Sequence, residues 1–172
     1  MINKASNWVE YCMSQIPCKK GALALDLACG HGRNSILLAK YNCKVISIDI
    51  DILSLKSFNR KNIIKVQTDL ENFLNWPLNK NIFDIIIVTN FLNRKIFNYI
   101  KNSIKNNGYL IYETFGEGQQ FLGKPKNRKF LLKKNELLSL TKNLKLIFYE
   151  EVKVISGEAK FIKSRILCQN AR

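Results

Sequence analysis

Histidine is almost absent from this chain, which has one in 172 residues, and none of its five cysteines are paired as C-x-x-C. Structural zinc sites use four cysteine or histidine ligands, usually in closely spaced pairs. The sequence therefore predicts no metal site. It also predicts cysteines that stay scattered, reduced thiols.

No run of about 18 or more apolar residues occurs, so we expect no transmembrane helix and no membrane partner. Residues 1–6, MINKAS, lack the basic and then apolar layout of a secretory signal. Apolar residues make up 47% of the chain, enough for one core. We expect a single cytoplasmic domain over residues 1–172, in which residues 1–20 form a helix leading into the core.

Acidic residues are scarce: 13 stand against 28 Lys and Arg, and the net charge is +15. This charge points to a nucleic-acid partner. Only 6 of the 28 are Arg, the usual choice for bidentate phosphate contacts. The chain also holds 22 Lys, 20 Asn and 21 Ile, all with A- and T-rich codons. We therefore favour compositional drift, and keep RNA as an alternative partner.

Helical and strand-like apolar patterns alternate along the chain. Helices are expected at residues 7–16, 32–41, 51–60, 94–105 and 133–141, with Asn7 and Asp51 as N-caps and Gly108 ending the fourth. Strands are expected at residues 22–28, 44–49, 63–68, 83–88, 109–112, 144–155 and 160–168. This alternation predicts a parallel sheet covered on both faces, to which the last two strands add a hairpin through residues 156–158.

Two connections lack periodicity. Residues 69–81 are expected to form a loop. Residues 115–129 are long for a connection, carry four basic residues, and are predicted to act as a lid or binding loop that attracts an anionic acceptor. A solvated run of charge is the alternative.

Residues 26–35, DLACGHGRNS, connect the first strand to a helix. Gly30 and Gly32 allow a sharp turn and a close backbone approach, and the helix N-terminus offers free N–H groups to an anion. Asp49, at the end of the second strand, can accept both hydroxyls of a ribose. Asp69 ends the third strand and could accept from an adenine amino group. Each residue could serve only a turn or a cap, but one adenosine site explains all four.

These motifs resemble the class I S-adenosylmethionine-dependent methyltransferases, and within them the small bacterial tellurite-resistance methyltransferases. The resemblance covers roughly residues 20–155 and is carried by residues 26–35, 45–49, 69–73, 76–78, 83–92, 112–115 and 123–132. It implies an α/β, Rossmann-like, doubly wound sheet of seven strands in the order 3-2-1-4-5-7-6, with the last strand antiparallel. It also implies S-adenosylmethionine as cofactor and S-adenosylhomocysteine as product.

The implied cofactor-binding residues are Asp26, Ala28, Cys29, Gly30, His31, Gly32, Arg33, Asn34, Asp49, Ile50, Asp69, Leu70, Thr89 and Asn90. Ala28 departs from the family pattern, which has a glycine there. Arg33 is expected near the cofactor carboxylate, with a solvated arginine as the alternative. His31 is expected to form part of the cofactor wall rather than to act as a base.

Methyl transfer requires alignment and exclusion of water more than a particular catalytic side chain, so the sequence names no catalytic residue. The acceptor-side candidates lie near strand ends and are Asn90, Arg94, Tyr112, Glu113 and Thr114. The expected acceptor is a small molecule, anionic or a soft nucleophile. The oligomeric state stays open.

Two other classes of protein compete with this interpretation. A nicotinamide-dependent dehydrogenase would carry a third glycine where this chain has Ser35, and would need a substrate domain. An RNA-binding module on the same fold, or a methyltransferase acting on RNA, would use the positive charge. The chain has no interleaved aromatic and basic motif of the RNA-recognition type and no appended RNA-binding domain.

Overall fold

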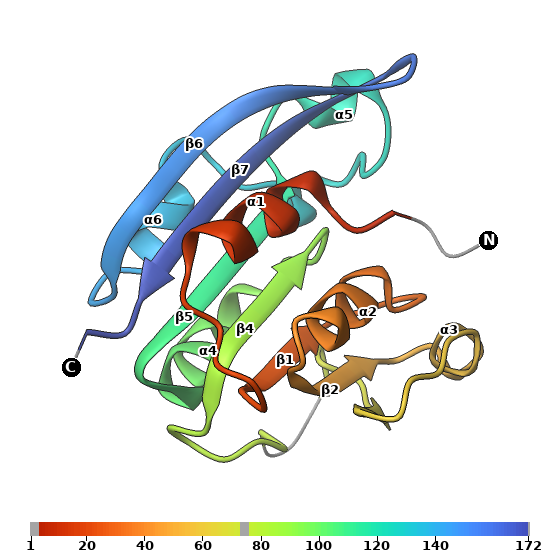
Figure 1. Ribbon diagram of the computed structural model, residues 1–172. Coiled ribbons are helices and arrows are strands. Elements are labelled where there is room, and N and C mark those ends of the chain that lie inside the picture. Colours follow the sequence, from red (N-terminus) through yellow and green to blue (C-terminus); the bar gives the residue numbers. More distant parts are fainter. Residues whose placement is uncertain (1–3, 73–75, 172) are drawn as a thin grey trace.

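The computed structural model describes residues 4–72 and 76–171 (Figure 1). Seven strands form one sheet in the order β3-β2-β1-β4-β5-β7-β6. Their bounds are β1 Leu23–Leu27, β2 Lys44–Asp49, β3 Ile63–Gln67, β4 Phe83–Thr89, β5 Ile104–Phe115, β6 Lys145–Ser156 and β7 Ala159–Gln169. Strands β1 to β5 pair in parallel, whereas β7 pairs antiparallel with β5 and β6. The predicted sheet is confirmed.

Strand β4 shows how an apolar run supports a sheet that is covered on both faces. Ile85 and Ile87 belong to the core on one face, and Ile86 and Val88 belong to the core on the other. Successive side chains of a strand point to opposite faces, so an unbroken apolar run fills both cores. All four side chains are at most 1% exposed.

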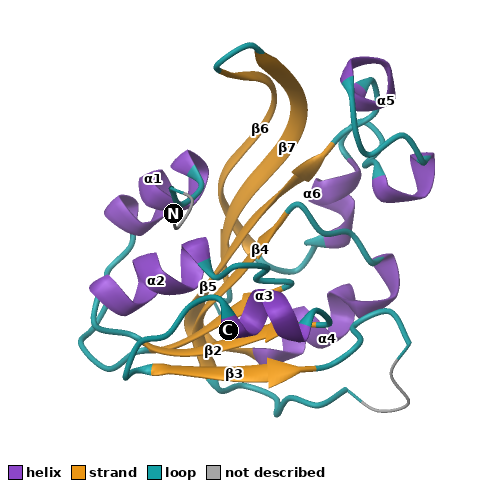
Figure 2. Ribbon diagram, turned by 90° about the vertical axis from the view of Figure 1, so that its right-hand side faces the viewer, coloured by secondary structure: helices purple, strands orange, loops and turns teal. Residues whose placement is uncertain are grey.

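Helices cover the two faces of the sheet. Their bounds are α1 Asn7–Gln15, α2 Arg33–Lys40, α3 Ile52–Lys56, η1 Arg94–Ile96, α4 Phe97–Ser103, α5 Gln119–Leu122, η2 Arg128–Phe130 and α6 Glu136–Leu140. Helices α1 and α2 pack on one face, and α4 and α6 pack on the other (Figure 2).

No helix in the two described ranges is long and apolar enough to cross a bilayer. All five cysteines are free thiols.

The N-cap and the fourth predicted helix need correction. The N-cap of α1 is Ser6, and Asn7 is the first helical residue. The helix predicted at 94–105 is the 3-10 turn η1 followed by α4. Ile104 already pairs with Phe83, next to a β-bulge, so β5 begins there. Gly108 is consequently a strand residue and does not end a helix.

Three other predicted segments differ in extent. Helix α3 stops at Lys56 instead of reaching 60, although Asp51 caps it as predicted and accepts from the Leu53 N–H at 2.9 Å. Helix α6 is shorter than the predicted 133–141. The segment 115–129 contains α5 and the start of η2. In the predicted loop 69–81, residues 73–75 lie outside the described residues, and the rest contains no helix or strand.

The predicted hairpin of β6 and β7 turns at Gly157 and Glu158. The first part of β7 lies beside α5 (Figure 1), where the Ile162 N–H donates to Oε1 of Gln119 at 2.8 Å. The hairpin therefore reaches past the sheet and forms a wall beyond the carboxyl ends of the central strands.

Substitution of Gly108 tests whether this residue lies in β5, packed against β4, as the structure shows. A methyl group there would lie 2.8 Å from the Phe83 carbonyl oxygen and 2.9 Å from that of Lys105. We expect Gly108→Ala to lower the free energy of unfolding by about 2 kcal/mol in urea titrations. The control Gly123→Ala is at an extended position, where the nearest atom to the added methyl group is 3.7 Å away, and should lose less than about 1 kcal/mol. Equal losses would contradict the close packing of β5 on β4.

Candidate functional site

The turn after β1 contains three left-handed residues, Ala28, Gly30 and Gly32, at φ +51°, +52° and +71°. A Cβ on Gly32 would lie 2.5 Å from the Phe58 ring, so only glycine at this position lets the turn pack against Phe58. A Cβ on Gly30 would meet nothing within 4 Å. The backbone at Gly30 is therefore open to a bound molecule at the N-terminus of α2.

Asp49 connects the end of β2 to this turn. Its Oδ2 accepts from the Gly30 N–H at 2.7 Å, and its Oδ1 accepts from the Asp51 N–H at 3.0 Å. Asp49 also borders a cavity of about 510 Å³, called here the β2 cavity. The β2 cavity is lined by Ala28, Asp49, Ile50, Thr68, Asp69, Leu70, Glu71, Asn72 and Phe91.

A neighbouring cavity of about 380 Å³, called here the turn cavity, follows the turn itself. It is lined by Ala28, Cys29, Gly30, His31, Arg33, Thr89 and Asn90. Because both cavities include Ala28, they adjoin along the carboxyl ends of β1, β2 and β4. Open α/β sheets bind ligands at this edge, where the strand order reverses.

Asp26 lies fully buried behind the turn. The Ser35 hydroxyl donates to Oδ2 of Asp26 at 2.6 Å. The Ser47 hydroxyl donates in turn to Oγ of Ser35 at 2.8 Å. Burial raises the pKa of Asp26 to about 7, against the lowering effect of Ser35. Among the described residues its Oδ1 has no hydrogen-bond partner. Buried polar atoms are normally paired, so this oxygen is an exception, and Asp26 lines neither the β2 cavity nor the turn cavity.

Asn90 is held firmly after β4. It adopts φ +58°, and its N–H donates to the Glu113 carbonyl at 2.8 Å. Its Oδ1 accepts from the ammonium group of Lys163. The Tyr112 hydroxyl donates to the carbonyl of Phe91 at 2.8 Å and fixes the next residue. Side chains of β5 and β7 thus set the position of this turn.

Two further cavities border Asn90 and Phe115. The loop cavity, about 600 Å³, is lined by Glu71, Asn90, Phe91, Leu92, Phe115, Lys124, Pro125, Lys126, Asn127 and Phe130. The hairpin cavity, about 430 Å³, is lined by Lys4, Ala5, Ser6, Asn7, Arg33, Asn90, Glu113, Phe115, Val154, Ile155, Ser156, Phe161, Lys163 and Arg165. Since Asn90 also lines the turn cavity, all three cavities meet at this residue.

Buried polar contacts fasten the N-terminal segment over this region. Glu113 accepts from Nε of Arg165 at 2.7 Å and from Oγ of Ser6 at 3.0 Å. Asn34 accepts from the Ser6 N–H at 3.1 Å and donates to Oγ1 of Thr89 at 3.0 Å. The residues before α1 are therefore tied to α2, β4, β5 and β7 together.

Most predicted cofactor residues line the β2 and turn cavities: Ala28, Cys29, Gly30, His31, Arg33, Asp49, Ile50, Asp69, Leu70, Thr89 and Asn90. Asp26, Gly32 and Asn34 instead support the turn from behind. The carboxylate of Asp69 accepts from the N–H of Glu71 at 2.7 Å and from Nδ2 of Asn72 at 3.0 Å, and these bonds lower its pKa. Asp69 thus caps its own loop as well as bordering the cavity.

Of the acceptor-side candidates, Asn90 and Glu113 line cavities. Arg94 is directed elsewhere, because its guanidinium group binds both carboxylate oxygens of Glu136 and the backbone carbonyls of residues 129 and 131. Tyr112 is fully buried, and Thr114 is 1% exposed. These last three residues shape the site from behind.

Sequence reasoning missed Lys163. The register of the antiparallel pair places Lys163 opposite Phe115, and this pairing brings it to Asn90. Phe161, Lys163 and Arg165 alternate along one face of β7, which is the only sequence signal for the position. Alternation alone does not say which partner strand a lysine will face.

Comparison with known proteins defines the class. Residues 18–160 match a family described as a methyltransferase domain. Ribosomal protein L11 methyltransferase of Campylobacter concisus is 36% identical over 103 residues, covering 54% of this chain and 35% of that protein. TehB of Haemophilus influenzae superposes with a TM-score of 0.75 at 23% identity, over 94% of this chain and 60% of that chain. Geranyl diphosphate C-methyltransferase of Streptomyces coelicolor, solved with S-adenosyl-L-homocysteine, gives 0.73 at 13% identity, over 96% and 80%.

The chain therefore belongs to the methyltransferase-domain family, in agreement with the resemblance that its motifs indicated. The chain spans 35% of the L11 methyltransferase and 60% of TehB. The structural likenesses, all below 25% identity, describe the fold.

Ala28 supplies a test of the turn, because a left-handed alanine costs about 1 kcal/mol that glycine avoids. We expect Ala28→Gly to leave the free energy of unfolding unchanged or to raise it by up to about 1 kcal/mol. The control Ala24→Gly, at a fully buried position of β1, removes the same methyl group and should lose about 1–2 kcal/mol. Chemical denaturation measures both. A loss at Ala28 as large as that at Ala24 would contradict the strained conformation.

Proposed function

We propose that the chain binds S-adenosylmethionine across the β2 and turn cavities and transfers its methyl group to a small acceptor in the loop and hairpin cavities. One observation carries this proposal. The turn, loop and hairpin cavities meet at Asn90, at the carboxyl end of the central strand β4. A methyl donor in the turn cavity and a methyl acceptor in the loop or hairpin cavity would therefore meet beside Asn90.

The residues of the β2 cavity suit an adenosine. Each carboxylate oxygen of Asp49 accepts one backbone N–H and keeps a second lone pair for a ribose hydroxyl. Ile50, which is 60% exposed, and Leu70 offer apolar contact to an adenine ring. Asp69 lines the same cavity, and its carboxylate would accept a hydrogen bond from an adenine amino group.

The turn cavity suits a short amino-acid tail. The first N–H groups of α2 and the guanidinium of Arg33 point to a carboxylate there. Thr89 and Asn90 border the end of the cavity nearest the acceptor.

S-adenosylmethionine supplies a methyl group on a sulfonium, which leaves as a neutral thioether. The protein must align the acceptor and exclude water. Asn90 is suited to alignment because backbone and side-chain bonds both hold it. Residues 4–7, held by the bond from Ser6 to Glu113, line the hairpin cavity and would help to shield a bound acceptor from water. A thiolate acceptor would need no base.

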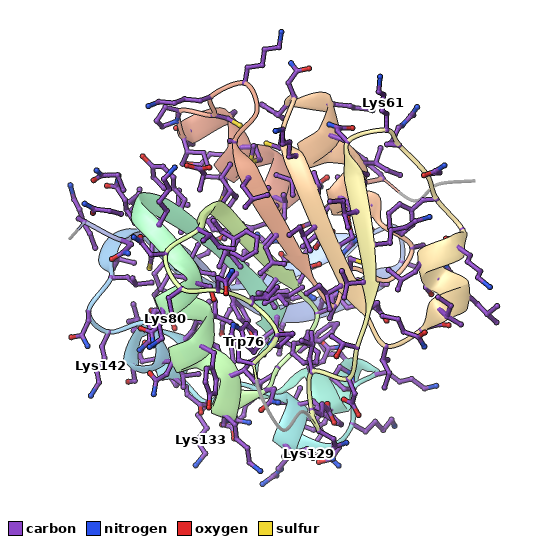
Figure 3. All side chains as sticks on the ribbon, turned by 90° about the horizontal axis from the view of Figure 1, so that it is seen from below. Lys61, Trp76, Lys80, Lys129, Lys133 and Lys142 are labelled. Atoms are coloured by element: carbon purple, nitrogen blue, oxygen red, sulfur yellow. The ribbon has the colours of Figure 1, made fainter. Side chains whose placement is uncertain are left out.

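Of the exposed lysines labelled in Figure 3, Lys61 lies apart, and the others lie in the lower and left part of the view: Lys80, Lys129, Lys133 and Lys142. Cavities of about 600 and 430 Å³ suit a small molecule. We therefore propose a small acceptor in preference to RNA.

Cofactor binding is tested by thermal unfolding with S-adenosylhomocysteine at millimolar concentration. We expect the ligand to raise Tm by roughly 5 °C or more, the shift for a ligand at about 100 times its Kd. Asp49→Ala should remove most of this shift because the ribose loses a charged acceptor. Asp51→Ala is the matched control, since Asp51 caps α3 and should keep the shift. No shift in the natural chain would contradict the proposed cofactor site.

The acceptor is tested by transfer of a labelled methyl group from the cofactor. The panel contains thiols, oxyanions of tellurium and selenium, small carboxylates, and RNA. We expect labelled product with at least one small acceptor and none with RNA. Labelled RNA, with every small acceptor unlabelled, would instead show an RNA methyltransferase. Steep salt-dependent RNA binding without cofactor binding would show a non-catalytic RNA-binding module.

A further inference from the structure

Lys163 is a buried cation that has no carboxylate partner among the described residues. Its side chain is on β7 and is 6% exposed. The ammonium group donates to Oδ1 of Asn90 and lies 3.4 Å from the centroid of the Phe115 ring. In the described ranges no carboxylate forms an ion pair with it, because Glu113 is engaged by Arg165 and Ser6. Burying an unpaired charge is costly, so such a group is normally matched by an anion.

The hairpin cavity around Lys163 has an excess of positive charge. Lys4, Arg33, Lys163 and Arg165 line it, against Glu113 alone. Arg165 is neutralised by Glu113 and by Glu150, at 2.7 and 3.0 Å. Arg33 also borders the turn cavity, where the carboxylate of the cofactor would occupy it. Lys163 therefore remains as the buried cation available to an acceptor.

The adjoining loop cavity is mainly apolar. Phe91, Leu92, Phe115, Pro125 and Phe130 form its walls. A cavity of about 600 Å³ is far larger than a bare oxyanion needs and has room for an aromatic ring with substituents. Burying such a body is favourable in proportion to its apolar area.

The two environments meet at two residues. Asn90 and Phe115 line both the loop cavity and the hairpin cavity, and Lys163 contacts both of them. We infer that the methyl acceptor is an organic acid, with an apolar, ring-sized body in the loop cavity and an anionic group held by Lys163. This inference rests on the proposed methyltransferase function and names the class of its substrate.

The test uses acceptors matched in shape: the 2-, 3- and 4-mercaptobenzoates against the corresponding mercaptotoluenes, with mercaptoacetate as the acid without a ring. In each reaction the thiolate forms a bond to the methyl carbon while the bond from carbon to the sulfonium breaks. The electron pair of the broken bond stays on the departing sulfur. The thiol proton has already gone to water.

For the natural chain we expect kcat/KM of the best mercaptobenzoate to exceed those of its mercaptotoluene and of mercaptoacetate by at least tenfold. Lys163→Met should abolish the preference over mercaptotoluene, mainly through KM, and Lys163→Arg should retain it in part. Lys160→Met, at an exposed lysine on the same strand, is the control and should retain it fully.

A pH profile separates anion binding from a merely structural lysine. Burial, with the charges of Arg33 and Arg165, lowers the pKa of Lys163 to about 8, although Glu113 opposes this. Glu113 of β5, Arg33 of α2, Arg165 of β7 and Lys4 of the N-terminal segment are the charged groups lining the same cavity. The ammonium is charged below this pH and neutral above it. KM for mercaptobenzoate should therefore rise above about pH 8 in the natural chain but not in Lys163→Arg.

The outcomes separate the two proposals. If S-adenosylhomocysteine stabilises the natural chain but no mercaptobenzoate is preferred, or none is methylated, the inference is overturned and the cofactor site stands. The inference is likewise overturned if Lys163→Met reduces both acceptor series equally. Retention of the thermal shift in Lys163→Met shows that the variant is folded. Absence of any shift in the natural chain would overturn the proposed function itself.

Discussion

The parallel pairing of β1 with β2 on one side and β4 on the other is the constraint on which the site depends. Because the three strands run in one direction, their carboxyl ends meet at a single edge. Asp49 and Thr89 are distant in sequence, yet both lie beside the turn that begins at Ala28. The sheet ladders satisfy the backbone polar groups, and this leaves the side chains at the strand ends available to a ligand.

Strain and buried charge gather at the same edge. Ala28 and Asn90 are both left-handed, and both line cavities where the cofactor and the acceptor would meet. Residues in such conformations persist where the surrounding structure holds them, commonly at functional sites. The bond from the Asn90 N–H to Glu113 and the bond from Lys163 supply that restraint. The antiparallel strand β7 thus completes the site as well as the sheet.

Much of the fold could be predicted because local patterns and global topology agree. The apolar run of β4, the turn of Gly30 and Gly32, and the hairpin at Gly157 all lie where their residue types place them. The boundary between α4 and β5 could not be predicted, since Ile104 begins its strand through pairing with Phe83, a contact outside any local window. The surroundings of Arg94 could not be predicted for a similar reason, because its partner Glu136 lies 42 positions away.

The sequence by itself determined the family. It also predicted an adenosine site, because the glycine turn and the two acids after it follow consecutive strands, whose carboxyl ends lie at one edge of a parallel sheet. Only the tertiary structure decided the acceptor side. Lys163 meets Asn90 across 73 positions, through the register of β7 on β5. A one-residue shift of that register would turn Lys163 to the other face of the sheet. Local sequence reports which elements form, whereas the packing of distant strands selects which side chains share a cavity.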